Sequence, residues 1–368
     1  MRIEKIAIHA FRNLTEVRLD CAGRWNVLVG ANAQGKTNIL EAIFLLGTLK
    51  SFRMAKNSEL IAWNRPHALL KGMVESQQVK RELALVIEPH GKRVQVDRKG
   101  TATLKDFLGV LNVIAFSPEE LFMVRGNPEI RRRYLDRAVF SVDPTYLACH
   151  REYFRILKNR NTLLRQRSFA TLDAWSEQLV SAGAQLVWKR AAFVQELAAF
   201  FTRLYQQITG SDEEAYLCYY ADSCHNPDTV EGCETALRAA LTARSDEERQ
   251  RGTTLAGPHR DDLRFFLNGI LLKQHGSQGQ QRSFILAMKM AEIENACCHT
   301  GFPPVLLLDD LTSELDKNRL GHLLEFLTQR QIQVFMTTTD LATLPAIAGD
   351  SAVYRVNVGE VSQRGMND

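Results

Sequence analysis

Residues 25–47, WNVLVGANAQGKTNILEAIFLLG, join three pieces that together predict the fold. A short apolar run comes first, a loop of the form GxxxxGK followed by Thr occupies residues 30–37, and a helical pattern comes last. Glycines let backbone N–H groups surround phosphate oxygens, and the helix N-terminus adds partial positive charge. A glycine turn with an incidental lysine would have the same letters. The apolar run before it and the helix after it favour a phosphate-binding loop.

Each position of this loop has an expected task. Lys36 would reach the terminal phosphates of a nucleotide, and the Thr37 hydroxyl would bind Mg²⁺. The loop residues expected to contact the nucleotide are Gly30, Ala31, Asn32, Ala33, Gln34, Gly35, Lys36, Thr37 and Asn38. The helix after the loop would bury one apolar face, made of Ile39, Leu40, Ile43, Leu46 and Leu49.

A second apolar run, PVLLLDDLTSELD at residues 304–316, leads into two aspartates. A buried strand that ends in a carboxylate is a common way to bring a Mg²⁺-binding acid to a phosphate site. Asp309 would hold the metal, directly or through water, and Asp310 would polarise the attacking water. Aspartates also commonly end strands and cap helices, so the pair is informative mainly because the phosphate loop is present.

Composition bounds the class of protein. The chain has 368 residues, of which 45% are apolar and 24% charged, with a net charge of +4. These values are typical of a globular protein of two or three domains, and by themselves they exclude few functional classes of protein. None of the seven cysteines has zinc-site spacing, so we expect free thiols and a reducing compartment. The N-terminus does not resemble a signal peptide, and no apolar run approaches the ~20 residues of a membrane helix, which predicts a cytoplasmic protein.

The texture of the chain changes twice. Residues 1–30 and 69–116 are rich in strand patterns, residues from about 118 are helical and charged, and strand–loop–helix patterns return near 253. We therefore predict an α/β domain formed by residues 1–117 and 253–368, with residues 118–252 as an inserted helical lobe. Charge is unevenly distributed along the lobe. Residues 125–167 contain eleven Lys or Arg and four acidic residues, whereas residues 212–249 contain ten acidic residues and three Arg.

The string SQGQQ at residues 277–281 precedes another helical pattern. Ser277, or Ser283 a turn later, could simply cap this helix. An exposed serine oxygen and the N–H of Gly279 at a helix N-terminus would also form a second anion site.

In this order the motifs resemble those of the SMC-like ATP-binding-cassette ATPases, with SQGQQ as the signature and LLLDDLTSELD as Walker B and D-loop. The resemblance narrows to the RecF family through five further stretches, which together with the phosphate loop and residues 309–316 are distributed over nearly the whole chain. They are FRNL at 11–14, SFR at 51–53, FSPEELFMVRGNPEIRRRYLD at 116–136, GPHRDDL at 257–263 and SQGQQR at 277–282. The inserted residues 137–250 contribute least. The chain departs from cassette transporters at Gln278, where they usually have glycine, and at Asp310, where they have glutamate. Thr337, Thr338 and Thr339 stand where transporters carry a switch histidine, which leaves the γ-phosphate sensor open.

The resemblance implies a homodimer that holds two ATP molecules between its subunits and hydrolyses them slowly, as a DNA-dependent switch. Lys36, Asp309 and Asp310 would carry the chemistry. Residues that would reach a nucleotide from elsewhere are Arg12, Asn13 and Arg53 from the first third of the chain, and Ser277, Gly279, Gln280 and Asp316 from the partner subunit. The implied partners are gapped, double-stranded and single-stranded DNA, and RecR, with RecO and RecA acting indirectly.

The DNA contacts would come from the basic half of the helical lobe. The candidates are Arg131, Arg132, Arg133 and Arg137, and Arg151, Arg155 and Lys158, which repeat at i, i+4 and i+7. Such a face suits DNA phosphates, although it could also be a solvated helix face or pair with the acidic segment after residue 212. His259 could contact nucleotide or a neighbouring subunit, or be structural. The alternatives are another SMC-like ATPase head and the nucleotide-binding subunit of a transporter, which would bind a membrane protein instead of DNA.

Overall fold

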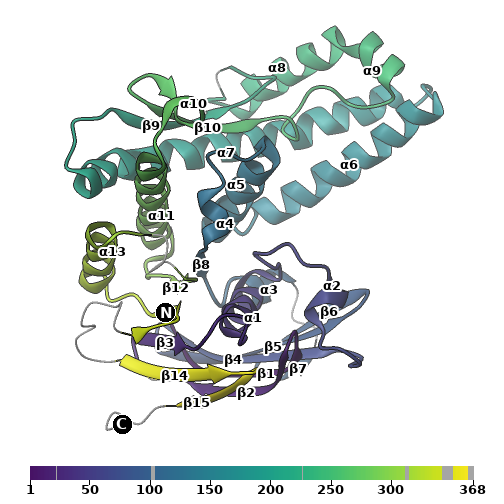
Figure 1. The fold of residues 1–368 in the computed structure, drawn as a ribbon. Helices are drawn as coiled ribbons and strands as arrows, with labels where there is room; N and C mark the ends of the chain where they lie inside the picture. The colour runs from purple at the N-terminus through teal and green to yellow at the C-terminus, as the bar shows by residue number, and fades with distance from the viewer. Residues whose placement is uncertain (22, 101–103, 226, 311–314, 342–350, 364–368) are drawn as a thin grey trace. The chain divides into compact units, whose positions relative to one another are not determined.

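The computed structural model describes residues 1–21, 23–100, 104–225, 227–310, 315–341 and 351–363 (Figure 1). The chain divides into two compact units: Met1–Glu120 with Ala296–Asp368, and Leu121–Asn295. The discontinuous first unit follows the pattern expected from the sequence. The division itself differs, because residues 253–295 pack in the second unit, where β10 (Asp262–Leu267) pairs with β9 (Ala215–Tyr220).

One sheet of the first unit is antiparallel, in the order β2-β1-β4-β5-β6-β7. Its strands are β1 (Arg2–Phe11), β2 (Leu14–Asp20), β4 (Ala68–Ser76), β5 (Val79–Glu88), β6 (Gly91–Val96) and β7 (Lys99–Gly100). In β2, β4 and β5, buried and more exposed residues largely alternate. An antiparallel sheet with one face on a core has this pattern, so the sequence prediction of strands here is confirmed.

The other sheet of this unit is mainly parallel, in the order β15-β14-β3-β13-β12-β8. Its strands are β3 (Trp25–Val29), β8 (Val113–Phe116), β12 (Val305–Leu308), β13 (Val334–Thr338), β14 (Ser351–Asn357) and β15 (Glu360–Gln363). Only β15 pairs antiparallel. Every residue of β8, β12 and β13 is buried, which explains the unbroken apolar runs of β8 and β12.

Helix α1 (Lys36–Thr48) contacts strands of both sheets and shares one apolar core with them (Figure 1). The predicted apolar face is correct for Ile39, Leu40, Ile43 and Leu46, none of which is more than 1% exposed. Leu49 is the C-cap that follows the helix. The prediction of a single buried face was too narrow, since the side chains between these positions are also buried against the sheets. The first unit also contains the helices α2 (Asn57–Leu60), α3 (Leu104–Leu108) and α13 (Lys317–Gln329), and α4 (Pro118–Leu121) lies at the boundary between the two units.

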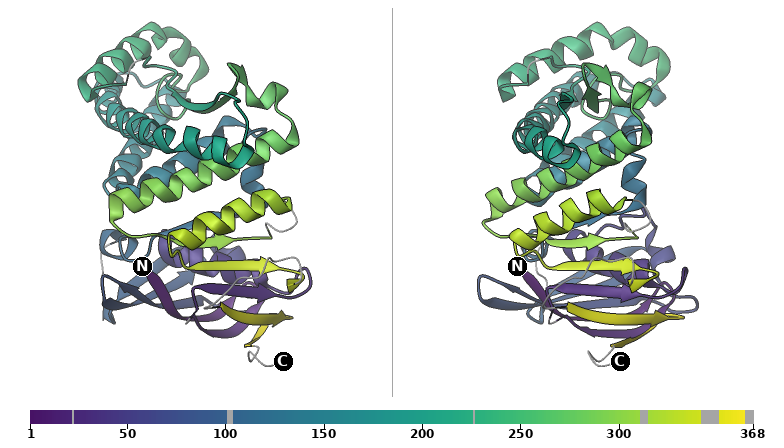
Figure 2. Two further views of the ribbon diagram at one scale, coloured as in Figure 1. Left: turned by 90° about the vertical axis from the view of Figure 1, so that its left-hand side faces the viewer. Right: turned by 60° about the vertical axis from the view of Figure 1, so that its left-hand side comes forward.

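The second unit is mostly helical, as predicted. Its helices are α5 (Pro128–Val142), α6 (Tyr146–Gln166), α7 (Leu172–Thr209), α8 (Val230–Ala243), α9 (Ser245–Arg251), α10 (Leu272–His275) and most of α11 (Gln278–Thr300). The long helices α6 and α7 pack side by side (Figure 2). The sequence did not predict the small antiparallel sheet β11-β10-β9, in which β11 is Ile270–Leu271.

Two expectations from composition can be compared with the structure. All seven cysteines are free thiols, as predicted. In the part of the chain that the structure describes, no helix combines the length and the apolar content needed to cross a bilayer.

Candidate nucleotide site

The phosphate loop lies between β3 and α1, where the sequence places it. Gly35 precedes α1 with φ of +111°, a backbone conformation that L side chains rarely adopt. At Gly30, a Cβ atom would overlap the carbonyl oxygen of Val356 in the adjacent strand β14. Both glycines are therefore required by the backbone path of the loop itself. Ala31, Asn32 and Ala33 form its exposed tip.

The Lys36 side chain folds back onto the loop. Its Nζ donates to the carbonyl oxygens of Gly30, at 2.6 Å, and Ala31, at 2.9 Å, and the residue is only 7% exposed. Burial lowers the pKa of Lys36, although Asp310 and Asp309 oppose the shift. The two carbonyls occupy donor sites of the ammonium that phosphate oxygens would take over.

The predicted metal pair comes together at the end of the parallel sheet. Thr37 Oγ1 donates to Oδ1 of Asp309 at 2.9 Å. Asp309 directly follows β12 and is 7% exposed. A hydroxyl and a carboxylate oxygen at this spacing suit Mg²⁺, which takes oxygen ligands and usually completes its shell with phosphate and water. Among the described residues there is no group of three or more His, Cys, Asp or Glu that could hold a metal by itself.

Thr337 supports both aspartates. Its Oγ1 donates to Asp309 Oδ1 at 2.9 Å and accepts from the backbone N–H of Asp310 at 2.8 Å. Parallel pairing of Leu308 with Met336 puts the residues that follow them side by side. Asp310 has φ of +48°, in the left-handed region, so this hydrogen bond fixes a backbone conformation that is uncommon outside glycine. Thr337 stands where cassette transporters carry a switch histidine, and here its hydroxyl holds the Asp309 carboxylate and the Asp310 backbone.

Asn13 and Arg53, which are expected to contact the nucleotide, lie next to residues of the loop and the start of α1. Asn38 donates to Asn13 Oδ1 at 2.7 Å, and Arg53 Nη1 donates to Asn38 Oδ1 at 3.1 Å. Asn13 also donates weakly to the Gln34 carbonyl at 3.4 Å. The backbone N–H of Val358 donates to Gln34 Oε1 at 2.6 Å, which ties the loop to the β14–β15 turn. These hydrogen bonds link four residues expected to contact the nucleotide, Asn13, Gln34, Asn38 and Arg53, into one network.

Arg12 has a different immediate partner. Its Nε and Nη2 each donate at 3.0 Å to the carboxylate of Glu41, which is fully buried in α1 and also accepts from the Ser51 hydroxyl. This bidentate ion pair ties the first strand and the segment after α1 to the helix of the phosphate loop. Sequence reasoning missed Glu41, because a lone glutamate within an apolar helical pattern looks like its exposed position.

The signature residues Ser277 and Gln280 lie in the second unit and form a reciprocal cap at the start of α11. The N–H of Ser277 donates to Gln280 Oε1 at 2.8 Å, and the N–H of Gln280 donates to Ser277 Oγ at 3.1 Å. This is a capping box, so the N-cap interpretation of Ser277 is confirmed, whereas Ser283 is buried within the helix. Ser277 and Gln278 are exposed and Gly279 is half-buried.

Asp316, the predicted D-loop contact, caps α13. Its carboxylate accepts from the backbone N–H of Arg319 at 2.9 Å and pairs with the Arg319 guanidinium. The backbone hydrogen bond and this ion pair lower the pKa of Asp316. Residues 311–314 of the motif lie outside the described residues.

The basic residues of α5 are less available than the sequence suggested. Arg131 is 6% exposed, and its guanidinium donates to both carboxylate oxygens of Asp262, at 2.7 and 2.9 Å. A buried, bidentate arginine cannot be a surface contact for DNA, so the structure contradicts that expectation. Arg132 is half-buried and donates to the Asp261 carbonyl at 2.7 Å. Arg133 remains exposed and pairs with Glu129 on its own helix.

The three basic residues of α6 are exposed, as their spacing predicted. Arg151, Arg155 and Lys158 lie on the solvent side of the helix, whereas Tyr153 and Ile156 between them are buried. Arg155 donates to both oxygens of Glu152, at 2.9 and 2.6 Å, which neutralises part of the face.

The GPHRDD motif begins with a crowded turn. Gly257 has φ of +130°, and a Cβ there would lie 2.5 Å from the Tyr153 hydroxyl. His259 Nε2 lies 3.2 Å from the Thr254 carbonyl, which can only accept, so Nε2 carries the proton and Nδ1 accepts from Tyr153 at 2.6 Å. Burial lowers the pKa of His259 to about 4, despite the opposing Thr254 hydrogen bond. The histidine is therefore a neutral structural residue of this turn.

The two aspartates of the motif are also bound internally. Asp262 holds Arg131, and the Asp261 carboxylate accepts from the Tyr219 hydroxyl and from the Asp222 N–H. The preceding carbonyl of Pro258 accepts from the fully buried Arg190 at 2.7 Å. The motif thus joins β9, β10, α5 and α7 inside the second unit, which sequence reasoning did not explain.

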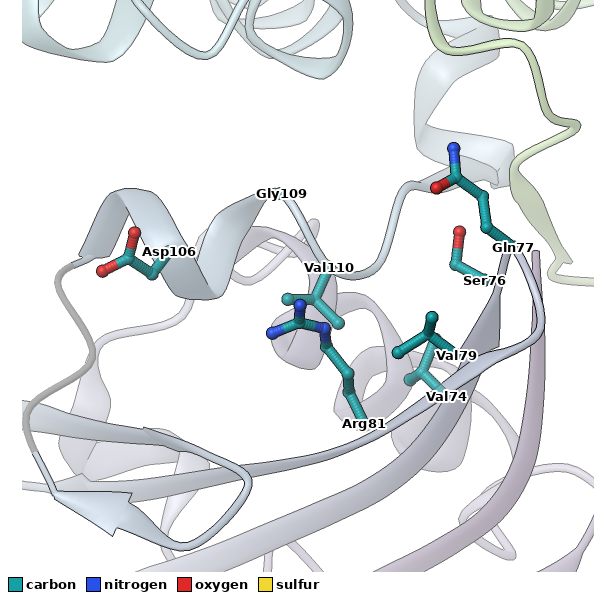
Figure 3. Close-up of a pocket in the computed structure, with 8 residues that line it drawn as sticks. All are labelled: Val74, Ser76, Gln77, Val79, Arg81, Asp106, Gly109 and Val110. Carbon is teal, nitrogen blue, oxygen red and sulfur yellow. The ribbon is translucent and has the colours of Figure 1, made fainter.

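A cavity of about 450 Å³ lies in the first unit near the turn between β4 and β5 (Figure 3). Its lining residues are Val74, Ser76, Gln77, Val79, Arg81, Asp106, Gly109 and Val110. None of these residues belongs to a site predicted from the sequence, and none belongs to the phosphate loop.

Comparison with known proteins places these features in a family. The family described as RecF/RecN/SMC N terminal domain matches residues 2–362. The chain is 50% identical to the DNA replication and repair protein RecF of Geobacter sulfurreducens, over 98% of this chain and all of that protein. It is 38% identical to the protein of the same name from Halalkalibacterium halodurans, over 99% of this chain and all of that protein.

Solved structures agree. The recombination mediator protein RecF with ATP, described as part of the RecFOR pathway, matches with a TM-score of 0.89 and 28% identity, over 99% of this chain and 97% of that one. An Smc head domain from Pyrococcus furiosus, at a TM-score of 0.55 and 15% identity over 99% of this chain and 96% of that one, shares the fold alone. With an SMC-like cassette ATPase fold and relatives of this name along its whole length, the chain belongs to the RecF family of DNA replication and repair proteins.

Proposed function

We propose that the chain is an ATP-dependent DNA-binding protein of recombinational DNA repair and replication, in which ATP joins two copies of the chain. The observation that carries the proposal is the meeting of Thr37 and Asp309. Their side-chain oxygens lie 2.9 Å apart although the residues are far apart in sequence, and they lie next to a phosphate loop with a buried lysine. A turn that merely contained glycine and lysine would not need this pairing.

The residues of the first unit have separable tasks towards the nucleotide. Lys36 exchanges its two carbonyl acceptors for phosphate oxygens. Thr37 and Asp309 would hold Mg²⁺, which when bound neutralises phosphate charge. Asp310 orients the attacking water, and its side chain is one methylene shorter than the glutamate of transporters. Looser control of that water fits slow, switch-like hydrolysis.

The second unit supplies the other half of the site, from a second copy of the chain. The capped N-terminus of α11 presents an exposed serine hydroxyl, and helix N-termini attract anions. We assign Ser277, Gly279 and Gln280 to the γ-phosphate of ATP bound by the partner copy, with Asp316 nearby. ATP makes its contacts with the second copy only in the joined state, so bound ATP stabilises the dimer, and its hydrolysis releases it.

DNA binding is assigned to the exposed face of α6. Arg151, Arg155 and Lys158 could each approach a phosphate, and such binding weakens with salt. No base-reading motif is present in the sequence, so the preference would concern DNA structure, such as gaps. By the relatives' place in the RecFOR pathway, RecR and RecO are the expected partners, with RecA loading at single-strand gaps in the cytoplasm as the outcome.

Sedimentation tests the dimer. With a non-hydrolysable ATP analogue the mass of the wild-type protein should double. Lys36→Met should abolish the change because the nucleotide is no longer held. Ser277→Arg should still bind ATP yet stay monomeric, because the added side chain blocks the partner's phosphate. An unchanged wild-type mass would contradict the dimer, and loss of ATP binding in Ser277→Arg would contradict a role across the interface.

Fluorescence anisotropy on gapped, duplex and single-stranded DNA, with ATP, ADP or no nucleotide, tests the second ligand. The double variant Arg151→Glu, Lys158→Glu should weaken binding at least tenfold, since it replaces two phosphate contacts with repulsion. Lys273→Glu is the matched control, because this exposed lysine lies in α10. Equal affinities of the double variant and the control for DNA would show that α6 is not part of the DNA-binding surface of the protein.

A further inference from the structure

The capping box of α11 is oriented by a carboxylate that belongs to no motif. Gln280 Nε2 donates to Glu213 Oε1 at 2.6 Å, while Gln280 Oε1 accepts from the Ser277 N–H at 2.8 Å. A glutamine amide can point either way, but a carboxylate only accepts. Glu213 therefore fixes the amide with its NH₂ group outward and its oxygen towards Ser277. The flipped amide would place a donor against the Ser277 N–H.

Glu213 is itself held on its other oxygen. Oε2 accepts from the hydroxyl of Tyr205, a fully buried residue of α7, at 2.9 Å and from the Ser211 hydroxyl at 3.2 Å. Partial burial alone would raise the pKa of Glu213, but the hydrogen bonds from Gln280, Tyr205 and Ser211 outweigh it and lower the pKa. The carboxylate is thus charged at neutral pH and anchored to the longest helix of the unit.

The capping box also determines the direction of the Ser277 hydroxyl proton. Because Ser277 Oγ accepts from the Gln280 N–H, the hydroxyl proton points away from the helix and is left to donate elsewhere. Gln281 steadies the neighbouring backbone, since its Nε2 donates to the Gly276 carbonyl at 2.7 Å and its Oε1 accepts from Arg125 at 2.8 Å. The two glutamines therefore have different tasks, and only Gln280 depends on Glu213.

We propose that Glu213 is a positioning residue for the signature serine: through Gln280 it holds the Ser277 hydroxyl in the direction from which it meets the γ-phosphate bound by a second copy of this chain. The inference rests on the proposed ATP-dependent dimer. It adds a residue of the helical lobe, 64 positions before Ser277, to the machinery that senses the partner's nucleotide.

The test compares three single variants in two measurements on the full-length protein. ATP binding is measured at a protein concentration too low for dimers, and ATP-analogue-dependent dimerisation is measured by sedimentation. Glu213→Ala should weaken dimerisation about tenfold or more, the usual effect of removing a hydrogen bond to a charged group, with ATP binding unchanged. Glu213→Gln keeps an acceptor for Gln280 and should stay within about twofold of wild type. Glu214→Ala removes the adjacent exposed carboxylate and should change neither property.

A double-mutant cycle separates positioning from general damage. Because Glu213 acts through Gln280, the double variant Glu213→Ala, Gln280→Ala should dimerise no worse than Gln280→Ala alone. If Glu213→Ala does not fold, Tyr205→Phe removes the hydroxyl that holds Glu213 Oε2 at 2.9 Å, and it should weaken dimerisation with ATP binding unchanged. Wild-type dimerisation by Glu213→Ala, or additive losses in the double variant, overturns the inference and leaves the proposed function intact. If wild type itself does not dimerise with the analogue, the proposed function fails and this inference falls with it.

Discussion

Replacing Thr337 by valine tests how the carboxylate pair is held. The substitution keeps the shape of the side chain and removes the hydroxyl that joins Asp309 Oδ1, at 2.9 Å, to the Asp310 N–H, at 2.8 Å. Asp309 keeps the hydrogen bond from Thr37, so the carboxylate loses one of its donors. Asp310 loses the contact that fixes its left-handed backbone.

The size of the effect follows from these two hydrogen bonds. A hydrogen bond to a charged group contributes about 1.5–3 kcal/mol, and a buried backbone N–H left without a partner costs about 1–3 kcal/mol. The second value lies at its lower end here, because Asp310 is half-buried and water can reach it. We expect the free energy of unfolding of the first unit to fall by about 2.5–4 kcal/mol, which lowers its Tm by roughly 5–16 °C. A displaced carboxylate also misplaces the attacking water, so the ATPase rate should fall up to about a hundredfold.

Differential scanning calorimetry and steady-state ATPase assays measure both quantities. Thr337→Ser is the control, since it keeps the hydroxyl and should lie close to wild type in rate. If Thr337→Val has the wild-type Tm and rate, the hydroxyl does not hold the aspartates. If Thr337→Ser is as impaired as Thr337→Val, packing of the methyl group accounts for the effect instead.

Two further predictions concern the second unit. Arg131→Ala should lower its stability by about 3 kcal/mol, because Asp262 is left without its partner in a largely buried site. Arg133→Ala removes an exposed pair and should change stability by about 0.5 kcal/mol or less; equal losses in thermal unfolding would contradict the assignment of Arg131 as structural. As pH falls, His259 becomes protonated in the unfolded chain near 6.5 but in the folded unit only near 4, so its burial removes stability across that interval. His259→Gln should therefore flatten the loss of Tm between pH 6.5 and 4, and an unchanged slope would show that His259 does not contribute.

Local pattern was enough to predict the elements that carry the nucleotide site. The strand, loop and helix around residues 30–37, and the strand before Asp309, were each predicted from a few neighbouring letters and are confirmed. The support of these elements was not predictable, because it comes from contacts between distant segments. Thr337 reaches Asp309 through strand pairing, and Glu41 becomes an ion-pair partner only when Arg12 folds against it.

The basic residues of α5 and α6 show the same limit of prediction from local sequence pattern. Helical spacing correctly predicted that Arg151, Arg155 and Lys158 share an exposed face. It could not show that Arg131 is withdrawn from the surface, since its partner Asp262 lies 131 residues later. A charged residue in a helical pattern is therefore a good guide to exposure only where no distant opposite charge packs against it.

The two helix N-termini that we propose to bind phosphate differ in how ready they are for a ligand. At the phosphate loop, Lys36 already has two carbonyl acceptors, which a nucleotide must displace before it gains the ammonium. At the signature, the capping box leaves the Ser277 backbone satisfied and its hydroxyl proton directed outward, so little has to be rearranged. A preorganised site binds with less loss of freedom than one that must first break internal bonds. We therefore expect the binding of ATP to a single chain to be the less favourable step, and the association of that chain with a second copy to be the more favourable one. In the proposed dimer, that order would make dimerisation depend on bound ATP, since closure without nucleotide would bring the signature serine against a loop whose lysine is turned inward.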